Sequence, residues 1–184
     1  GERTAAVSGK LAYNARSGID FPTVGDWVMI DCASPTAIIH QILKRKSAFI
    51  RKSAGTEISA QQIVAANIDI IFICMSLNED FSLRRLERYM TAAWDSMAIP
   101  VVVLTKADLC DDLQTKLAQI APISIGADVV VFSALNGYGY DEVKKHIDSS
   151  QTVAFIGSSG VGKSTLINRL MKREVLETGE IRKD

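Results

Sequence analysis

The chain has 184 residues, of which 47% are hydrophobic, and its 21 Lys and Arg residues balance its 21 Asp and Glu residues. This composition is typical of a globular protein with a hydrophobic core, and the length leaves room for one or two domains. Neither a run of 18 apolar residues nor a signal-peptide pattern occurs, so we expect a cytoplasmic protein that does not bind a membrane.

Short β-strands are predicted within residues 1–52. Strand-like segments at 4–8, 27–31 and 36–43 alternate with turn residues such as Gly25 and Pro35. Several short strands at close spacing predict a small β-barrel or sandwich. Residues 1–60 also hold eight Lys or Arg against five Asp or Glu, a small positive excess that favours an anionic partner.

A cluster of basic residues surrounds Phe49 near the end of this part. Basic side chains beside an aromatic ring suit contact with phosphates and stacking on bases. An equally good interpretation is a solvated strand edge that its charges protect, with Phe49 in the core. The candidate RNA-binding residues are Lys44, Arg45, Lys46, Arg51 and Lys52.

From about residue 60 the pattern changes to alternating strands and helices, which predicts a parallel α/β sheet. Four apolar, β-branched runs are the candidate strands, and apolar residues at helical spacing mark the candidate helices. The predicted strands are 68–75, 100–104, 128–132 and 152–156, and the predicted helices are 83–93, 115–120, 141–147 and 164–172.

A phosphate-binding motif lies between the last predicted strand and the last predicted helix. Residues 157–165 match G-x-x-x-x-G-K-[ST], the P-loop, whose main-chain N–H groups and following helix N-terminus bind phosphates. A Gly-rich turn without a ligand is the alternative, and the strand–loop–helix context argues against it. The candidate nucleotide-binding residues here are Gly157, Ser158, Ser159, Gly160, Val161, Gly162, Lys163, Ser164 and Thr165.

Two residues of this loop are the candidate catalytic groups. Lys163 is expected to reach the β- and γ-phosphates of a nucleotide, and the Ser164 hydroxyl is expected to ligate Mg²⁺. The three cysteines and two histidines are not spaced as zinc ligands, so we expect the thiols to be idle.

Two further polar motifs follow predicted strands. Thr105-Lys-Ala-Asp108 comes after strand 100–104, and Ser133-Ala-Leu135 comes after strand 128–132. Ligands of open α/β sheets bind at the carboxyl ends of the strands, so both motifs are expected near the P-loop. The pair corresponds to the guanine-reading motifs of GTPases, usually Asn-Lys-x-Asp and Ser-Ala-x.

The chemistry of guanine explains these residue types. The Asp108 carboxylate would accept hydrogen bonds from guanine N1–H and the exocyclic amine, while the Lys106 stem lies along the base. The Ala134 N–H would donate to guanine O6, so adenine would leave buried polar groups unpaired. The alternatives are an Asp108 that only caps a helix and an ATP-using P-loop kinase, which the two base motifs disfavour.

The order of the motifs is unusual, because both base motifs precede the P-loop. In ordinary GTPases the P-loop comes first, then two switch segments, then the base motifs. The order here predicts a circularly permuted GTPase domain, which is physically tolerable because domain termini often lie close together.

The sequence resembles the bacterial ribosome small-subunit-dependent GTPases, which are permuted in this way. Members of that family have an N-terminal OB-fold, the permuted GTPase domain and a C-terminal zinc-binding domain, and they act in late maturation of the small ribosomal subunit. The resemblance lies in residues 6–11, 24–27, 45–49, 65–67, 75–81, 84–88, 103–108 and 157–168.

The resemblance implies a domain organisation and a set of ligands. Residues 1–52 would be an OB-fold barrel whose basic cluster faces rRNA, 53–66 a linker, and 67–184 a permuted GTPase domain that is incomplete at its C-terminus. The implied cofactors are GTP or GDP and Mg²⁺, and the implied partner is the small (30S) ribosomal subunit with its rRNA. We expect a cytoplasmic monomer.

Two departures from the GTPase pattern affect the expected activity. Thr105 stands where most GTPases have Asn, so we expect adequate rather than tight guanine binding. No D-x-x-G occurs in the sequence. The resemblance places both switch segments and the zinc ligands after residue 184, so zinc is expected only there, and residues 1–184 alone should bind nucleotide weakly and hydrolyse it poorly.

Two functions therefore stay open. The first is a GTP-hydrolysing enzyme in which Lys163 and a Mg²⁺ ion on Ser164 stabilise the charge that develops on the phosphates. The second is a nucleotide-gated rRNA-binding assembly module with little intrinsic hydrolysis, in which turnover only resets the affinity for rRNA.

Overall fold

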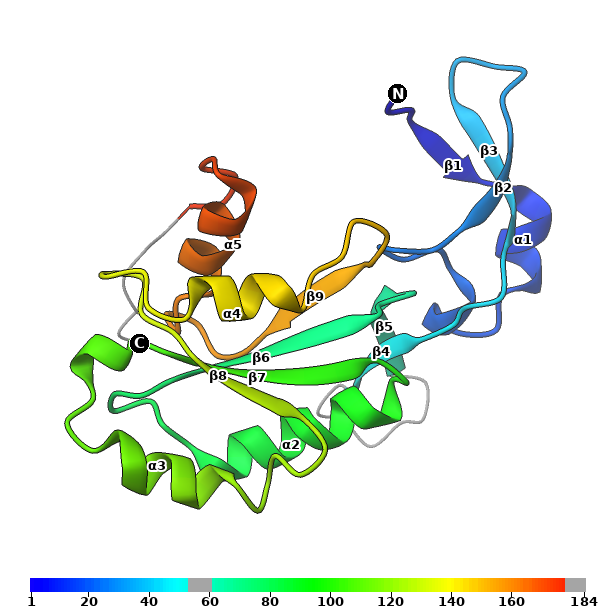
Figure 1. Cartoon of the computed structure of the whole chain (residues 1–184). Helices are drawn as coiled ribbons and strands as arrows, with labels where there is room; N and C mark the ends of the chain where they lie inside the picture. Colours follow the sequence, from blue (N-terminus) through cyan, green and yellow to red (C-terminus); the bar gives the residue numbers. More distant parts are fainter. Residues whose placement is uncertain (53–60, 178–184) are drawn as a thin grey trace. The chain divides into compact units, whose positions relative to one another are not determined.

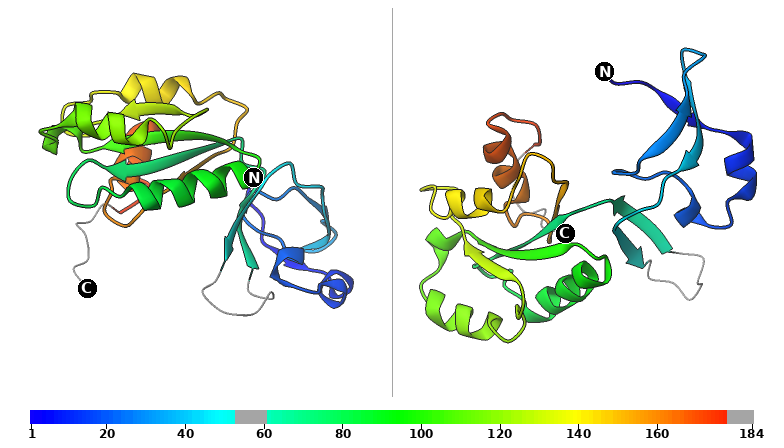
Figure 2. Two further views of the ribbon diagram at one scale, coloured as in Figure 1. Left: turned by 90° about the horizontal axis from the view of Figure 1, so that it is seen from below. Right: turned by 45° about the vertical axis from the view of Figure 1, so that its right-hand side comes forward.

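The computed structural model describes residues 1–52 and 61–177, and the chain divides into two compact units (Figures 1 and 2). Unit 1 is Gly1–Ile68 and unit 2 is Asp69–Asp184. Over the described ranges, none of the helices combines the length and the apolar character that crossing a membrane requires.

Unit 1 consists mainly of short strands. The strands predicted at 4–8, 27–31 and 36–43 are confirmed as β1 (Ala5–Val7), β2 (Val28–Asp31) and β3 (Ala37–Ile42). They form one sheet in which β3 pairs in parallel with β1 and antiparallel with β2. A short helix, α1 (Gly9–Asn14), follows β1 and begins with the Ser8 side chain accepting a hydrogen bond from Leu11 N–H at 3.2 Å.

A second sheet in unit 1 corrects the predicted linker. β4 (Ala48–Lys52) pairs antiparallel with β5 (Gln61–Ala66), so residues 61–66 are a paired strand and not a linker. Residues 53–60 lie outside the described part of the chain. Within residues 1–52 and 61–68, the two sheets are separate ladders of three and two strands.

Asn67 and Gly25 fix the end of β5 against an earlier turn. Asn67 has a left-handed backbone (φ 54°), and its side-chain amide donates to Gly25 C=O at 2.9 Å while accepting from Lys46 N–H at 2.8 Å. Gly25 also has a positive φ of 89°, and a Cβ atom at this position would collide with the carbonyl oxygen of Ala66. The turn can therefore approach β5 only because residue 25 lacks a side chain.

An enclosed ion pair links the same turn to the β3–β4 connection. Arg45 donates from Nε and Nη2 to the two carboxylate oxygens of Asp26, both at 2.7 Å. It also donates to Ile19 C=O at 2.7 Å and Phe21 C=O at 3.0 Å. The Asp26 side chain is 1% exposed and that of Arg45 is 17% exposed.

The ion pair changes both the pKa of Asp26 and the role expected of Arg45. Burial by itself raises the pKa of Asp26, but hydrogen bonds from Arg45 and from Thr23 N–H, with the Arg45 charge, bring it below the ordinary value. Because the guanidinium is held by Asp26 and two carbonyl groups, Arg45 has a structural role in unit 1.

Unit 2 contains a four-stranded parallel sheet in the order β8-β7-β6-β9, so the predicted parallel α/β sheet is confirmed. Ile70 of β6 lies opposite both Ile99 of β7 and Val153 of β9, which aligns the three strands. The strands are β6 (Ile70–Ser76), β7 (Ile99–Thr105), β8 (Asp128–Val131) and β9 (Val153–Ile156).

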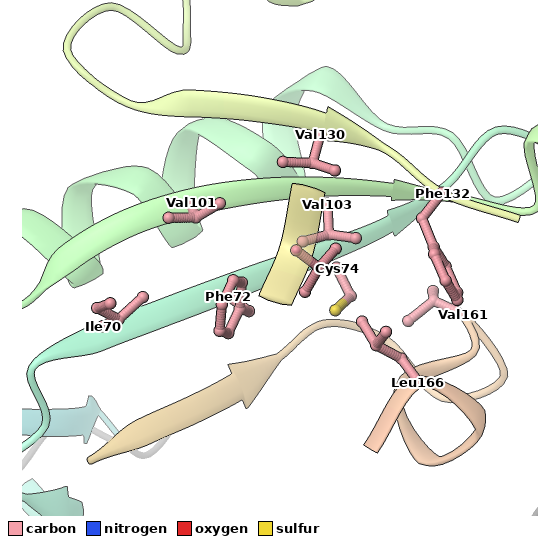
Figure 3. Packing of buried hydrophobic residues seen from close by; sticks show 10 residues of the cluster. Ile70, Phe72, Cys74, Val101, Val103, Val130, Phe132, Val161 and Leu166 are labelled. Atoms are coloured by element: carbon pink, nitrogen blue, oxygen red, sulfur yellow. The ribbon is translucent and has the colours of Figure 1, made fainter. Parts of the chain in front are cut away.

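Helices cover both faces of this sheet, so β6 is buried along its whole length and β7 is buried except at Ile99. Alternate residues of β6 and β7, with Phe132, Val143 and Leu166, form a core on the face covered by α4 and α5 (Figure 3). The helix α2 packs against β6 and β7 through the buried side chains of Leu86 and Met90. The helices are α2 (Leu83–Asp95), α3 (Leu113–Ile120), α4 (Tyr140–Lys145) and α5 (Lys163–Met171).

The Asp26–Arg45 ion pair should contribute to the free energy of unfolding of unit 1. Arg45→Met leaves the buried Asp26 carboxylate without its cation, so the free energy of unfolding at pH 7 should fall by about 3 kcal/mol. Asp26 has a lowered folded pKa, so its contribution is complete above the unfolded pKa of about 4 and is lost as the pH falls through the folded pKa. Urea unfolding of unit 1, followed by NMR, should therefore show a smaller difference between variant and parent at pH 3 than at pH 7.

The matched control is Lys46→Met, which removes the neighbouring exposed charge and should leave the unfolding curve unchanged. Equal stability of Arg45→Met and the parent at pH 7 would contradict a structural role for the ion pair.

Candidate nucleotide-binding site

The three predicted motifs lie at one edge of the sheet in unit 2. They follow β7, β8 and β9, which run parallel, so their carboxyl ends share that edge. Two hydrogen bonds join the two base motifs: Ala107 N–H donates to Phe132 C=O at 3.2 Å, and the Ser133 hydroxyl donates to the Asp108 carboxylate. The structure thus brings together residues that lie 25 positions apart in the chain.

The P-loop has the backbone conformation of a phosphate cradle. Gly157, Gly160 and Gly162 have positive φ angles of 149°, 73° and 94°. A Cβ atom at Gly157 would collide with the carbonyl oxygen of Cys74 on β6, so only glycine fits there. Among the described residues, none accepts a hydrogen bond from the main-chain N–H groups of 159–164, and α5 begins at Lys163. These donors and the helix N-terminus suit an anion such as a nucleotide phosphate.

Lys163 and Ser164, the two predicted catalytic groups, lie at the start of α5. Lys163 Nζ donates to Gly157 C=O at 2.9 Å and to Ser158 C=O at 2.6 Å, so the ammonium group lies against the loop. Partial burial lowers the pKa of Lys163, and the nearby charge of Asp80 opposes this shift. The Ser164 hydroxyl, in the first turn of α5, makes no hydrogen bond to the rest of the described chain.

A resident metal centre made of protein ligands is not found in the described ranges: no group of three His, Cys, Asp or Glu residues there could hold a metal ion. Mg²⁺ commonly takes only one or two protein ligands together with water and phosphate oxygens. A single free hydroxyl beside a phosphate cradle fits that ligand set. Buried Cys74 is a spectator, because burial raises the pKa of its thiol to about 12.

Thr105 joins the first base motif to the P-loop. Its buried hydroxyl donates to the Val161 C=O at 2.5 Å, with a longer contact of 3.4 Å to the Met75 C=O. The threonine that replaces the usual Asn thus joins this motif to the P-loop through its hydroxyl. The next residue, Lys106, has a left-handed backbone (φ 56°), a conformation that costs energy for a residue with a side chain and often marks a functional site.

Asp108 does not act as a helix cap. The helix that follows, α3, is capped by Asp112, whose side chain accepts from Thr115 N–H at 3.1 Å. Asp108 is exposed, and its carboxylate accepts the Ser133 hydroxyl, so the group is oriented and still accessible. This arrangement favours base reading over capping.

The second base motif forms a tight turn after β8. Ser133 is fully buried, its N–H donates to Tyr138 C=O at 3.0 Å, and its C=O accepts from Gly137 N–H at 3.0 Å. Leu135, in contrast, is 83% exposed, so this side chain does not belong to the core.

One part of the site was missed in the sequence. Arg85, in the first turn of α2, donates to the Asp80 carboxylate at 2.7 Å and to the Ser158 hydroxyl at 2.9 Å. The Ser158 hydroxyl in turn donates to Asp80. Burial alone raises the pKa of Asp80, but these hydrogen bonds and the Arg85 charge bring it below the ordinary value. Asp80 follows β6, just as the other motifs follow strands. This position in the sequence is the signal that could have marked it as a site residue.

The remaining basic residues of the predicted RNA cluster lie in unit 1. Lys44 and Lys46 are exposed and flank Arg45, while Phe49 is partly buried. Arg51 and Lys52 belong to β4, but their side chains lie outside the described part of the chain.

The fold matches two solved structures. YjeQ from Thermotoga maritima superposes with a TM-score of 0.65 at 23% identity, over 89% of this chain and 55% of that chain. YloQ, described as a circularly permuted GTPase, gives a TM-score of 0.57 at 24% identity, over 89% of this chain and 54% of that chain. The fold is therefore the α/β fold of circularly permuted GTPases.

Sequence comparison gives the family. The family model "RsgA GTPase" matches residues 42–184, so the chain belongs to the RsgA GTPase family. It is 54% identical over 185 residues to small ribosomal subunit biogenesis GTPase RsgA 2 of Lactiplantibacillus plantarum, covering all of this chain and 52% of that protein. It is 41% identical to RsgA 1 of Oceanobacillus iheyensis, covering all of this chain and 53% of that protein. The chain spans about half the length of these curated relatives.

Proposed function

We propose that the protein binds guanine nucleotides at the carboxyl edge of the sheet in unit 2 and hydrolyses GTP to GDP and phosphate. One observation carries the proposal: the Asp108 carboxylate, oriented by Ser133, shares an edge with a P-loop to which Thr105 is hydrogen-bonded. A carboxylate for the base and a cradle for the phosphates are thus held by one hydrogen-bonded network.

The proposed chemistry follows from the residues of the loop. The N–H groups of 159–164 would bind the β-phosphate, and Lys163 would move from the loop carbonyls to the β- and γ-phosphate oxygens. Water attacks the γ-phosphorus, the bond to the bridging oxygen breaks, and GDP takes the charge that Lys163 stabilises. Mg²⁺, held by the Ser164 hydroxyl and the phosphates, would neutralise further negative charge.

We propose that this activity serves late maturation of the small ribosomal subunit, with rRNA contacted by unit 1. The similarity to small ribosomal subunit biogenesis GTPases supports a role in this process. An OB-fold assignment for residues 1–52 is supported by the short strands of unit 1, and exposed rings (Tyr13, 89%; Trp27, 70%) suit base stacking. The exposed Lys44 and Lys46 would contact phosphates.

A second candidate is a nucleotide-gated rRNA-binding module with little intrinsic hydrolysis. The exposed Lys44 and Lys46 of unit 1, which suit contact with phosphates, are the observation that favours it. We propose that residues 1–184 alone bind GDP, because the base loops and the P-loop are within these residues.

Asp108→Asn tests the base site. The amide oxygen still accepts from guanine N1–H, but the amide NH₂ group faces the exocyclic amine of guanine, which is also a donor. Affinity for GDP should therefore fall by roughly 10²-fold, and affinity for XDP, which has a carbonyl in place of that amine, should rise. Titration calorimetry with GDP, XDP and ADP measures the change.

Asp111→Asn is the matched control, since it removes an exposed charge three residues away; its GDP affinity should equal that of the parent. A parent that binds ADP as tightly as GDP would contradict the proposed function, and unchanged preference in Asp108→Asn would remove Asp108 from the site.

The double variant Lys44→Gln/Lys46→Gln tests the RNA contact. Loss of two phosphate contacts should lower the slope of log affinity against log salt concentration by about one to two, measured with rRNA of the small subunit. The control is Lys144→Gln/Lys172→Gln, which removes two exposed charges of unit 2. If the unit 1 variant has the same salt slope as the parent, the alternative interpretation of these residues as a solvated strand edge would be favoured.

A further inference from the structure

Arg169, near the end of α5, reaches from the P-loop helix to the second base motif. Its Nη1 donates to the Ala134 C=O at 2.8 Å. The guanidinium lies over the Tyr140 ring at 5.5 Å from the centroid, and the Tyr140 hydroxyl donates to the Arg169 C=O at 3.3 Å. The side chain is thus held between the base loop and α4, although the residue is exposed.

The loop is shaped to receive this side chain. Gly137 has a positive φ of 80°, and a Cβ atom there would lie only 2.7 Å from Nη2 of Arg169. The Gly137 N–H donates back to Ser133 C=O at 3.0 Å, which closes the turn. Arg169 therefore packs on the turn at Gly137 and binds its main chain at Ala134.

The orientation of the Ala134 N–H follows from these contacts. Ser133 C=O and Ala134 N–H belong to one planar trans peptide, so they point in opposite directions. Because the Ser133 C=O points into the turn toward Gly137, the Ala134 N–H points out of it. Among the described residues, no acceptor receives that N–H. The next peptide, which carries the Ala134 C=O, is fixed by Arg169.

We propose that Arg169 is a positioning residue for guanine specificity, because it holds the turn in which the Ala134 N–H is presented to guanine O6. The inference rests on the proposed guanine site. It makes Arg169 a link between the helix that begins at the phosphates and the loop that reads the base, with an effect confined to nucleotides that carry an acceptor at position 6.

The test compares GDP with the diphosphate of 2-aminopurine riboside, which lacks O6 and also the N1–H that Asp108 would accept. In the parent, GDP should bind more tightly. Arg169→Gln should weaken GDP binding roughly three- to tenfold, as for loss of one hydrogen bond, and leave the 2-aminopurine nucleotide unchanged. Arg169→Lys, which keeps a charged donor but loses the planar fork, should recover part of the loss.

Two further variants and a check of folding complete the experiment. Arg173→Gln is the matched control, because it removes another exposed arginine close in the sequence; it should bind both nucleotides like the parent. Tyr140→Phe removes the hydroxyl that contacts Arg169 and should give a smaller, GDP-selective loss; thermal unfolding checks that each variant is folded. Equal weakening of both nucleotides in Arg169→Gln would overturn the positioning role. A parent without preference for GDP would instead contradict the proposed guanine site, which reads both O6 and N1–H.

Discussion

The parallel pairing of β6 with β7 on one side and β9 on the other is the constraint on which the nucleotide site depends. Since carboxyl ends of parallel strands meet at one edge, three loops converge there whatever their order in the chain. The approach is close: Gly157 leaves β9 against the carbonyl of Cys74 on β6. The permuted order of motifs therefore changes where the chain begins and leaves the geometry of the site intact.

Hydrogen bonds between loops turn this convergence into a single site. Each bond joins a group that follows one strand to a group on another element, so the base-reading and phosphate-binding halves constrain each other. We expect such a network to be coupled, with the loss of any member felt by the others. The joined pairs are Thr105 with Val161, Ser133 with Asp108, Arg169 with Ala134, and Arg85 and Asp80 with Ser158.

The sequence predicted what depends on local pattern and failed where distant partners decide. The strands of unit 2 and the three motifs follow from apolar runs and spacing, and the structure places them at one edge as expected. Arg45 and Lys46 look equivalent in a basic run, yet Asp26, 19 residues from Arg45, forms an ion pair with the arginine. The strand at 61–66 forms through its pairing with β4. The place of Arg85 at the site follows from its hydrogen bond to Ser158, 73 residues away.

Hydrogen exchange in the presence of GDP or ADP tests most directly whether three separate loops form one guanine site. The account predicts that GDP protects main-chain amides in residues 105–108, 133–138 and 157–164 together, at one half-saturating concentration. ADP at the same concentration should protect the base loops much less. Protection of 157–164 by both nucleotides, with 105–108 and 133–138 unaffected by GDP, would contradict the account, since the P-loop would then bind phosphate without any reading of the base.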